Sequence, residues 1–309
     1  MKILLVSGFL GAGKTTFIKE LITRTGTFPA ILENEYGDNS IDSRDLQQAA
    51  PEKEELKILE FMEGCVCCTM KDSFVNSVLA VYSSLDPEYL IIEPTGVGKL
   101  SNIIENLKPI LVGNVSLLKP IVVLSPESYS DNIKEWPELY KDQVANAQTV
   151  VFSKCEKSSL DVLSKAEEEI RKINPHANIT KGHYSNMDAG WWNALMRDDA
   201  DEQAVVSDAD KESSEENFSQ VTLDQAGLFN PAELVQFLED CLRGEYGHVA
   251  RAKGTLWVGK ELIRFDLADR MYIFSQSPED ICQSVFIGKY LDEKKLKNKL
   301  CGSRRARLK

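Results

Sequence analysis

The feature that most constrains the fold of this sequence is a glycine-rich motif near its beginning. Residues 8–15 read Gly-Phe-Leu-Gly-Ala-Gly-Lys-Thr, a complete G-x-x-x-x-G-K-[ST] phosphate-binding loop, between an apolar run at 2–6 and an amphipathic stretch at 15–25. The glycines let successive backbone N–H groups surround an anion, Lys14 reaches the β and γ phosphates, and the Thr15 hydroxyl binds Mg²⁺. The motif predicts a nucleotide-binding domain. The expected nucleotide contacts are Gly11, Ala12, Gly13, Lys14, Thr15 and Thr16.

The composition excludes several classes of protein. The chain has 309 residues, of which 43% are hydrophobic and 27% charged, as expected for one large or two ordinary globular domains. Its net charge of -12 argues against general nucleic-acid binding, and the basic cluster at 304–309 is a short tail. No run approaches the roughly 20 apolar residues of a membrane span, and the apolar start is too short for a signal peptide. We expect a cytoplasmic protein without membrane or nucleic-acid partners, whose seven cysteines are reduced thiols.

Short apolar runs alternate with longer amphipathic stretches over residues 1–197. Runs without polar alternation, such as Leu-Ile-Ile at 90–92 and Ile-Val-Val-Leu at 121–124, suit a parallel sheet covered on both faces. The pattern predicts a doubly wound α/β domain with a mostly parallel sheet, whose ligands bind at the carboxyl ends of the strands. The expected strands are 3–7, 30–34, 58–62, 89–93, 121–124 and 149–153, and the expected helices are 15–25, 72–85, 100–107, 133–147 and 159–174.

A smaller second domain is expected after an acidic linker. Residues 198–217 contain nine acidic residues, one lysine and almost no large apolar side chain, so they cannot bury enough surface to offset the entropy of ordering. A weak metal-collecting role is the alternative for this segment. Residues 218–309 are expected to form an α+β domain whose mostly antiparallel sheet carries helices on one side. Its expected strands are 255–258, 262–266, 271–275 and 284–287, and its expected helices are 231–242 and 292–300.

Two further motifs complete the predicted nucleotide site. Glu-Pro-Thr-Gly at 93–96 closes an expected strand, so that Glu93 can orient a Mg²⁺-bound water and Gly96 can sense the γ phosphate. Ser-Lys-Cys-Glu at 153–156 stands where GTPases of this topology carry a guanine-reading [NT]-K-x-D loop, with Lys154 along the purine plane and a carboxylate accepting from guanine. Because Ser153 replaces Asn or Thr and Glu156 replaces Asp, GTP is favoured while ATP, or a plain surface turn, stays the alternative.

A cysteine cluster is the most unusual local feature. Gly-Cys-Val-Cys-Cys at 64–68 lies just before an expected helix, whose N-terminal N–H groups favour the thiolates that bind Zn²⁺ and softer cations. No second C-x₂₋₄-C pair exists to complete a closed four-ligand site, so we expect an open transition-metal site. A redox-sensing cluster and plain buried cysteines are the alternatives. The other cysteines are isolated and are expected to be small hydrophobes: Cys155, Cys241, Cys282 and Cys301.

A carboxylate-rich segment occupies the position of a first switch. Glu-Asn-Glu-Tyr-Gly-Asp at 33–38 follows the second expected strand and precedes a polar stretch at 39–55. Its three carboxylates are either solvated loop charges or groups that contact Mg²⁺, position the attacking water or complete a metal site. The candidate catalytic residues are therefore Lys14, Thr15, Asp38 and Glu93.

Taken together, these motifs resemble those of the CobW-type P-loop GTPases, a metallochaperone family related to the hydrogenase and urease nickel-insertion GTPases. The resemblance rests on GFLGAGKTT at 8–16, ENEYG at 33–37, GCVCC at 64–68 and EPTG at 93–96, and it continues through RAKG at 251–254 and VFIG at 285–288. It implies a GTP-hydrolysing protein that binds Zn²⁺, or Co²⁺, and delivers it to a client protein. It also implies that Glu33, Cys67 and Cys68 are metal ligands, with Cys65 as a further candidate.

The resemblance suggests a metal switch. Mg·GTP would order the 33–38 segment so that Glu33 completes the metal site at Cys67 and Cys68, and hydrolysis would withdraw that carboxylate. The His-rich tract of some members is absent, since the chain has only His176, His183 and His248. No glutamine or arginine finger stands near the site, so we expect slow intrinsic hydrolysis that a client or a second protomer accelerates. The alternatives are an ATP-using small-molecule kinase or ligase, and a metal buffer without turnover.

Overall fold

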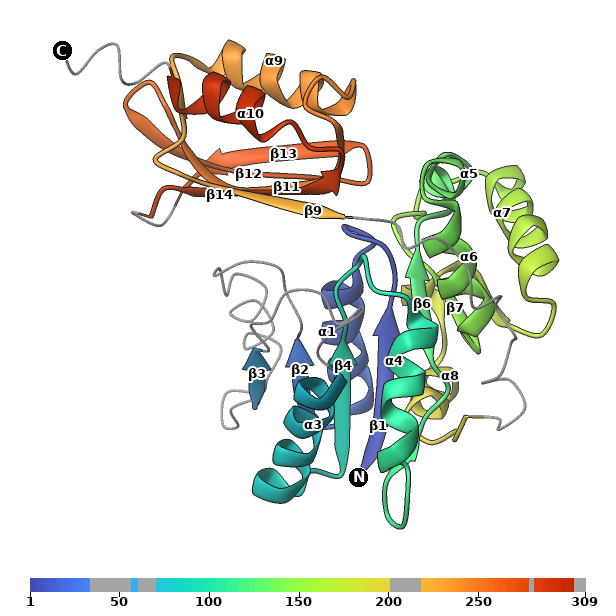
Figure 1. Ribbon diagram of the computed structural model, residues 1–309. Helices are drawn as coiled ribbons and strands as arrows, with labels where there is room; N and C mark the ends of the chain where they lie inside the picture. Colours follow the sequence, from blue (N-terminus) through green and yellow to red (C-terminus); the bar gives the residue numbers. More distant parts are fainter. Residues whose placement is uncertain (34–56, 61–70, 201–217, 278–280, 303–309) are drawn as a thin grey trace. The chain divides into compact units, whose positions relative to one another are not determined.

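Two structural units make up the chain. The computed structural model describes residues 1–33, 57–60, 71–200, 218–277 and 281–302. Met1–Ser214 and Glu215–Lys309 form separate units, each with its own sheet and hydrophobic core (Figure 1). None of the described helices combines the length and the apolarity needed to traverse a lipid bilayer.

In the described part of unit 1, eight strands form one sheet whose strand pairings are all parallel. The strands are β1 (Lys2–Ser7), β2 (Ala30–Glu33), β3 (Ile58–Glu60), β4 (Tyr89–Glu93), β5 (Ser116–Leu117), β6 (Ile121–Leu124), β7 (Thr149–Phe152) and β8 (Asn178–His183). They lie in the order β3-β2-β4-β1-β6-β7-β8, with the short β5 beside β1. Because the winding reverses on the two sides of β1, the loop that follows β1 lies at the switch point where such sheets bind ligands. The predicted doubly wound fold is confirmed.

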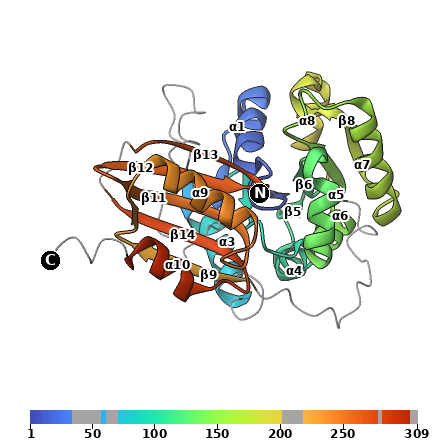
Figure 2. The same ribbon diagram turned by 90° about the horizontal axis from the view of Figure 1, so that it is seen from above.

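Helices cover both faces of this sheet. They are α1 (Lys14–Thr25), α3 (Lys71–Leu85), α4 (Leu100–Leu107), α5 (Pro126–Glu135), α6 (Pro137–Asn146), α7 (Leu160–Ile173) and α8 (Ala189–Leu195), with 3₁₀ turns η1 (Lys108–Ile110) and η2 (Tyr184–Asn186). Helices α1 and α8 lie on one face, whereas α3, α4 and α6 lie against the other (Figure 2). Phe17 of α1 stacks on Trp192 of α8 with ring centroids 5.5 Å apart, in a core that includes Val6 and Val123 from the strands. This core anchors α1 to the sheet directly after the phosphate loop.

The predicted helix at 133–147 is wrong. The segment contains the end of α5 and the whole of α6, which are separated at Trp136, whose φ of -127° and ψ of 56° are not helical. Pro137 explains the break, because a proline disfavours helical geometry at the residue before it but fits the first position of a new helix. Strand β8 and helix α8 were not predicted. Polar residues interrupt the apolar pattern of β8, and α8 has only seven residues, which is less than two full turns.

Most of the predicted linker lies outside the described residues. Of residues 198–217, only 198–200 are described, and they run antiparallel to residues 117–119, at the end of β5 and just after it. The Lys119 N–H donates to Asp198 O at 3.1 Å, and the Ala200 N–H donates to Leu117 O at 2.8 Å. These bonds attach the first residues of the acidic segment to the sheet of unit 1.

Unit 2 is an α+β unit with a mostly antiparallel sheet. Its strands are β9 (Ser219–Asp224), β10 (Gly227–Leu228), β11 (His248–Val258), β12 (Glu261–Ala268), β13 (Met271–Gln276) and β14 (Gln283–Lys289), in the order β13-β12-β11-β14-β9 with β10 beside β11. Helices α9 (Pro231–Leu242) and α10 (Glu293–Leu300) lie on one face of this sheet (Figure 1). Phe237 and Leu296 from these helices join Phe265 and Phe286 from the strands in one buried core. The predicted class is confirmed, although β9 and β10 were not expected.

Candidate functional site

The phosphate loop has the backbone conformation that its glycines permit. Gly8, Gly11 and Gly13 have φ angles of 143°, 75° and 92°, values that side-chain-bearing residues rarely adopt. A Cβ on Gly8 would lie only 2.2 Å from Val123 O, so the loop packs tightly against β6. Gly13 is the N-cap of α1, and the first N–H groups of this helix are available to an anion. The predicted strand–loop–helix arrangement is thus present.

The Lys14 ammonium group is held inside this loop. Its side chain is 6% exposed, and Nζ donates to Gly8 O at 3.1 Å and to Phe9 O at 3.3 Å. Nζ also lies 4.0 Å from Glu93 Oε1. The carbonyl groups and the carboxylate offset the cost of burying a positive charge, and they keep Nζ beside the loop that would receive phosphates.

Thr15 and Glu93 form the oxygen-rich edge of the site. Thr15 Oγ1 donates to Glu93 Oε1 at 3.1 Å and to Oε2 at 3.2 Å. A hydroxyl oxygen beside a carboxylate is the hard donor set that Mg²⁺ prefers, so this pair fits a magnesium ion that would also bind nucleotide phosphates. Thr16, the next residue of α1, is exposed. The fold therefore brings Lys14 and Thr15 of the phosphate-loop motif together with Glu93 of the 93–96 motif.

The turn that follows Glu93 packs directly onto the phosphate loop. A Cβ on Gly96 would lie 2.4 Å from Leu10 N, so only glycine permits this approach. Gln143 of α6 is buried, and its Nε2 donates to Gly98 O at 3.2 Å and to Gly96 O at 3.5 Å. The role of Gln143 could not be predicted from the sequence, because this residue lies in a helix without any motif and its contacts depend on where α6 packs.

Glu33 ends β2 next to Glu93 on β4. The two residues are register partners in the parallel β2–β4 pair, and the Glu33 side chain is 3% exposed. Glu60, the last described residue before the cysteine cluster, is in turn the register partner of Glu33. Neighbouring strands are about 4.8 Å apart, so the backbones of three glutamates form a row at the carboxyl edge of the sheet. The other predicted residues of this region lie outside the described residues: Asp38, Cys65, Cys67 and Cys68.

The predicted base-reading loop follows β7 and contacts the phosphate loop. Ser153 is 2% exposed, and its hydroxyl donates to Ala12 O at 2.7 Å and to Leu124 O at 3.2 Å. Ser153 therefore ties the two loops together. Lys154 has a φ of 54°, in the left-handed region, and Glu156 Oε1 lies 3.3 Å from His183 Nε2. Burial raises the pKa of the Cys155 thiol to about 11, so this cysteine stays protonated at neutral pH.

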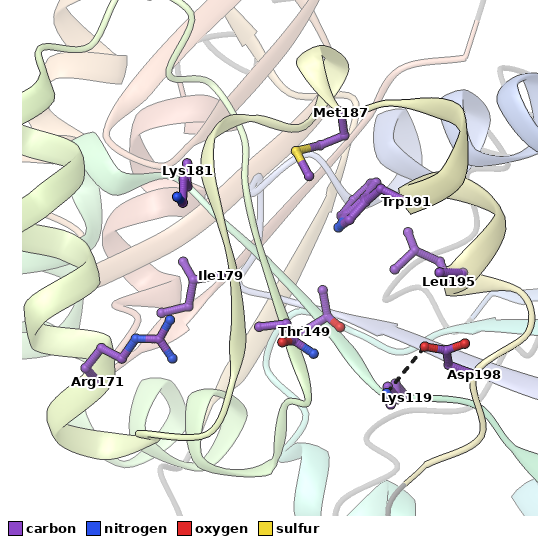
Figure 3. A pocket seen from close by; sticks show the side chains of 11 residues that line it. Lys119, Thr149, Arg171, Ile179, Lys181, Met187, Trp191, Leu195 and Asp198 are labelled. Atoms are coloured by element: carbon purple, nitrogen blue, oxygen red, sulfur yellow. Dashed lines mark hydrogen bonds and ion pairs between the residues drawn. The ribbon is translucent and has the colours of Figure 1, made fainter.

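A cavity of about 490 Å³ lies elsewhere in unit 1 (Figure 3). Lys119, Lys181 and Trp191 are among its lining residues, and none of these residues belongs to the phosphate loop, the 93–96 turn or the 153–156 loop. Two of its charged groups already have partners, because Lys119 pairs with Asp198 at 3.4 Å and Arg171 donates to Ala177 O at 2.6 Å. The cavity is thus separate from the candidate nucleotide site.

Comparison with known proteins agrees with this geometry. Residues 2–181 match the family described as CobW/HypB/UreG, nucleotide-binding domain. The chain belongs to this family. Residues 218–303 match the domain described as cobalamin synthesis protein cobW C-terminal domain, so the two matches cover both units. The predicted family resemblance is confirmed.

Several relatives of this protein have names that state a function. The zinc chaperone YjiA of Escherichia coli (strain K12) is 25% identical over 97% of this chain and 98% of its own length. The zinc-regulated GTPase metalloprotein activator 1 of Schizosaccharomyces pombe is 28% identical, but the match covers 60% of this chain and 46% of that protein. Among solved structures, the chain is similar to the crystal structure of Zn(II)-bound YjiA GTPase from E. coli. The sequence identity is 19%, the match covers 97% of each chain, and the TM-score is 0.44. The family and these names confirm the predicted GTPase class.

Proposed function

We propose that this protein is a GTP-dependent metallochaperone that carries Zn²⁺ to a client metalloprotein. The zinc ion is the cargo, and its proposed ligands are Glu33, Cys65, Cys67 and Cys68. Cobalt is the alternative cargo. The proposal is supported by relatives named zinc chaperones and a zinc-regulated GTPase metalloprotein activator. Thiolates with one carboxylate suit a borderline cation such as Zn²⁺ better than a hard ion such as Mg²⁺.

The observation that carries this proposal is the pairing of Glu33 with Glu93 across β2 and β4. One of these residues is a proposed cargo ligand, and the other contacts Thr15 and lies beside Lys14 in the phosphate loop. Because the two strands are hydrogen-bonded neighbours, a displacement at Glu93 on nucleotide binding is transmitted to Glu33 over one strand spacing. Nucleotide state and cargo affinity are thereby coupled.

The nucleotide reaction uses residues of the phosphate loop. The backbone N–H groups at 11–15 and the Lys14 ammonium bind the phosphates and stabilise the charge that develops on them. Thr15 and Glu93 would hold the magnesium ion, which supplies Lewis-acid stabilisation of the phosphates when bound. Asp38 is the proposed group that positions the attacking water. Ser153 keeps the base-binding loop in place against Ala12. We expect slow intrinsic turnover, which the client or a second copy of the chain accelerates.

The coupling is tested by Zn²⁺ titration of the full chain with and without a nonhydrolysable GTP analogue. We expect the analogue to change the Zn²⁺ affinity, and by linkage Zn²⁺ must change the affinity for the analogue by the same factor. A variant with Cys67→Ala and Cys68→Ala should retain nucleotide binding and lose the effect. Equal Zn²⁺ affinities with and without the analogue would contradict the proposed coupling between nucleotide and metal. Selective phosphate transfer from ATP to a metabolite would instead favour a kinase, and absence of turnover with every metal and client would favour a buffer.

A further inference from the structure

A histidine outside the predicted site contacts the proposed base-reading glutamate. His183 is the last residue of β8, and it is the register partner of Phe152 at the end of β7. This register brings the ring to the 153–156 loop, where His183 Nε2 lies 3.3 Å from Glu156 Oε1. The His183 side chain is 10% exposed, whereas that of Glu156 is 62% exposed. A nearly buried group thus contacts an exposed carboxylate at the candidate base site.

The other ring nitrogen shows which atom of His183 carries the proton. The backbone N–H of Ser185 donates to His183 Nδ1 at 3.3 Å, and Ser185 Oγ lies 2.8 Å from the same nitrogen. A ring nitrogen that accepts from an N–H group carries no proton of its own. The proton of the neutral imidazole is therefore on Nε2, which faces Glu156. With its proton on Nε2, the His183 ring presents an N–H group to the carboxylate 3.3 Å away without having to be charged.

Packing holds the His183 ring in a defined place relative to the phosphate loop. The ring lies on Tyr184 with a centroid distance of 4.2 Å, and Tyr184 contacts Phe17 of α1 edge-on at 5.1 Å. Helix α1 begins at Lys14, so this aromatic chain connects the histidine to the phosphate site. On the other side, the Phe152 N–H donates to Thr180 Oγ1 at 2.8 Å, which fixes β8 beside β7.

Glutamate at position 156 requires such support. A glutamate side chain has one more rotatable bond than the aspartate of the usual guanine-reading loop, and at an exposed position it loses more conformational entropy when it is fixed. We propose that His183, oriented by Ser185, holds Glu156 in the conformation that accepts from the N1–H and 2-amino groups of guanine. His183 is then a positioning residue that determines nucleotide specificity. An ionised carboxylate has about four acceptor sites, so the bond to His183 leaves enough for two guanine donors.

The inference rests on the proposed function because it needs guanine as the bound base. The experiment measures dissociation constants of the full chain for GDP, inosine diphosphate and ADP in the presence of Mg²⁺. Inosine diphosphate lacks the 2-amino group, so its comparison with GDP isolates one of the two proposed contacts. We expect His183→Phe, which keeps a ring on Tyr184 but removes the donor, to reduce the preference for GDP over both other nucleotides by about three- to tenfold. If the substitution only loosened the fold, the binding of all three nucleotides would weaken alike.

Two variants refine the comparison. His183→Gln keeps an N–H donor near the position of Nε2 and should restore most of the GDP preference, whereas His183→Asn is too short to reach Glu156 and should repeat the loss. His176→Phe is the matched control, because His176 is an exposed histidine outside the base site. If His183→Phe does not fold, as judged by thermal unfolding, the contrast between His183→Gln and His183→Asn decides the matter.

The outcomes separate the two proposals. A wild-type protein that binds ADP as tightly as GDP would contradict guanine recognition, and with it the proposed function. A wild-type protein that prefers GDP, together with unchanged preference in His183→Phe and His183→Asn, would overturn only the role of His183. Loss of the GDP preference in both of these variants, with its recovery in His183→Gln, would establish the positioning role of His183.

Discussion

Substitution of Gly96 by alanine tests the tight contact between the 93–96 turn and the phosphate loop. The added Cβ would lie 2.4 Å from Leu10 N and 2.8 Å from both Leu10 Cα and Phe9 C. Ordinary van der Waals contact begins at 3.4 Å, so the closest approach is short by 3.4 - 2.4 = 1.0 Å. All three neighbours are backbone atoms, which cannot rotate away as a side chain would. The phosphate loop and the 93–96 turn must therefore separate by about 1 Å.

That displacement has consequences for both stability and turnover. Overpacking of this kind costs about 1–3 kcal/mol, and in a unit of this size 1 kcal/mol lowers Tm by roughly 2–4 °C. At about 2 kcal/mol, the Tm of unit 1 in Gly96→Ala should therefore fall by roughly 4–8 °C. A misplacement of about 1 Å in a catalytic site costs on the order of 100-fold in rate. GTP hydrolysis should decrease by a comparable factor.

Differential scanning calorimetry and a phosphate-release assay measure the two effects. Gly182→Ala is the stability control, because a Cβ at Gly182 on β8 would meet no atom within 4 Å. Its Tm should stay unchanged or rise slightly, since alanine reduces the entropy of the unfolded chain. If Gly96→Ala has the Tm of Gly182→Ala and hydrolyses GTP at the wild-type rate, the close packing of the turn on the loop is not a requirement for function.

Three other perturbations address the remaining parts of the site. Thr15→Ala should weaken Mg²⁺-dependent GDP binding at least about tenfold, whereas Thr15→Ser should retain it, and chelation of Mg²⁺ should remove the difference between the two variants. Calorimetric titration measures the GDP affinities, and equal affinities of the two variants in the presence of Mg²⁺ would exclude Thr15 as a magnesium ligand. Ser153→Ala deletes the hydroxyl that donates to Ala12 O, so the free energy of unfolding, measured by denaturant titration, should fall by about 0.5–1.5 kcal/mol. An unchanged unfolding midpoint would mean that this hydrogen bond does not stabilise the fold. Because burial raises the pKa of Cys155 from 9.0 to about 11, its thiolate fraction at pH 8 is about 100-fold below that of an ordinary thiol. Its alkylation in native protein, followed by mass spectrometry, should rise about tenfold per pH unit between 8 and 10; a plateau above pH 9 would contradict the shift.

Local patterns were sufficient for much of unit 1. The phosphate loop was predictable because a glycine-rich turn between a strand and a helix has few conformations that accommodate an anion. Strands such as β4 and β6 were predictable because buried parallel strands are apolar throughout. The break at Trp136 and the strands β8 to β10 were missed, because one proline inside a helical pattern and short or half-exposed strands give weak periodic signals.

The sequence by itself determined the class of fold, the phosphate loop and the membership of a GTPase family, since these depend on residues that are close together in the chain. Only the tertiary structure decided which distant groups meet. Glu93 contacts Thr15 across 78 positions, Ser153 contacts Ala12 across 141, and Glu33 becomes the neighbour of Glu93 through the order of the strands. The partner of Glu156 was likewise decided by the register of β7 and β8, which places His183 beside the loop. Such contacts follow from strand order and register, which no local pattern of residues specifies.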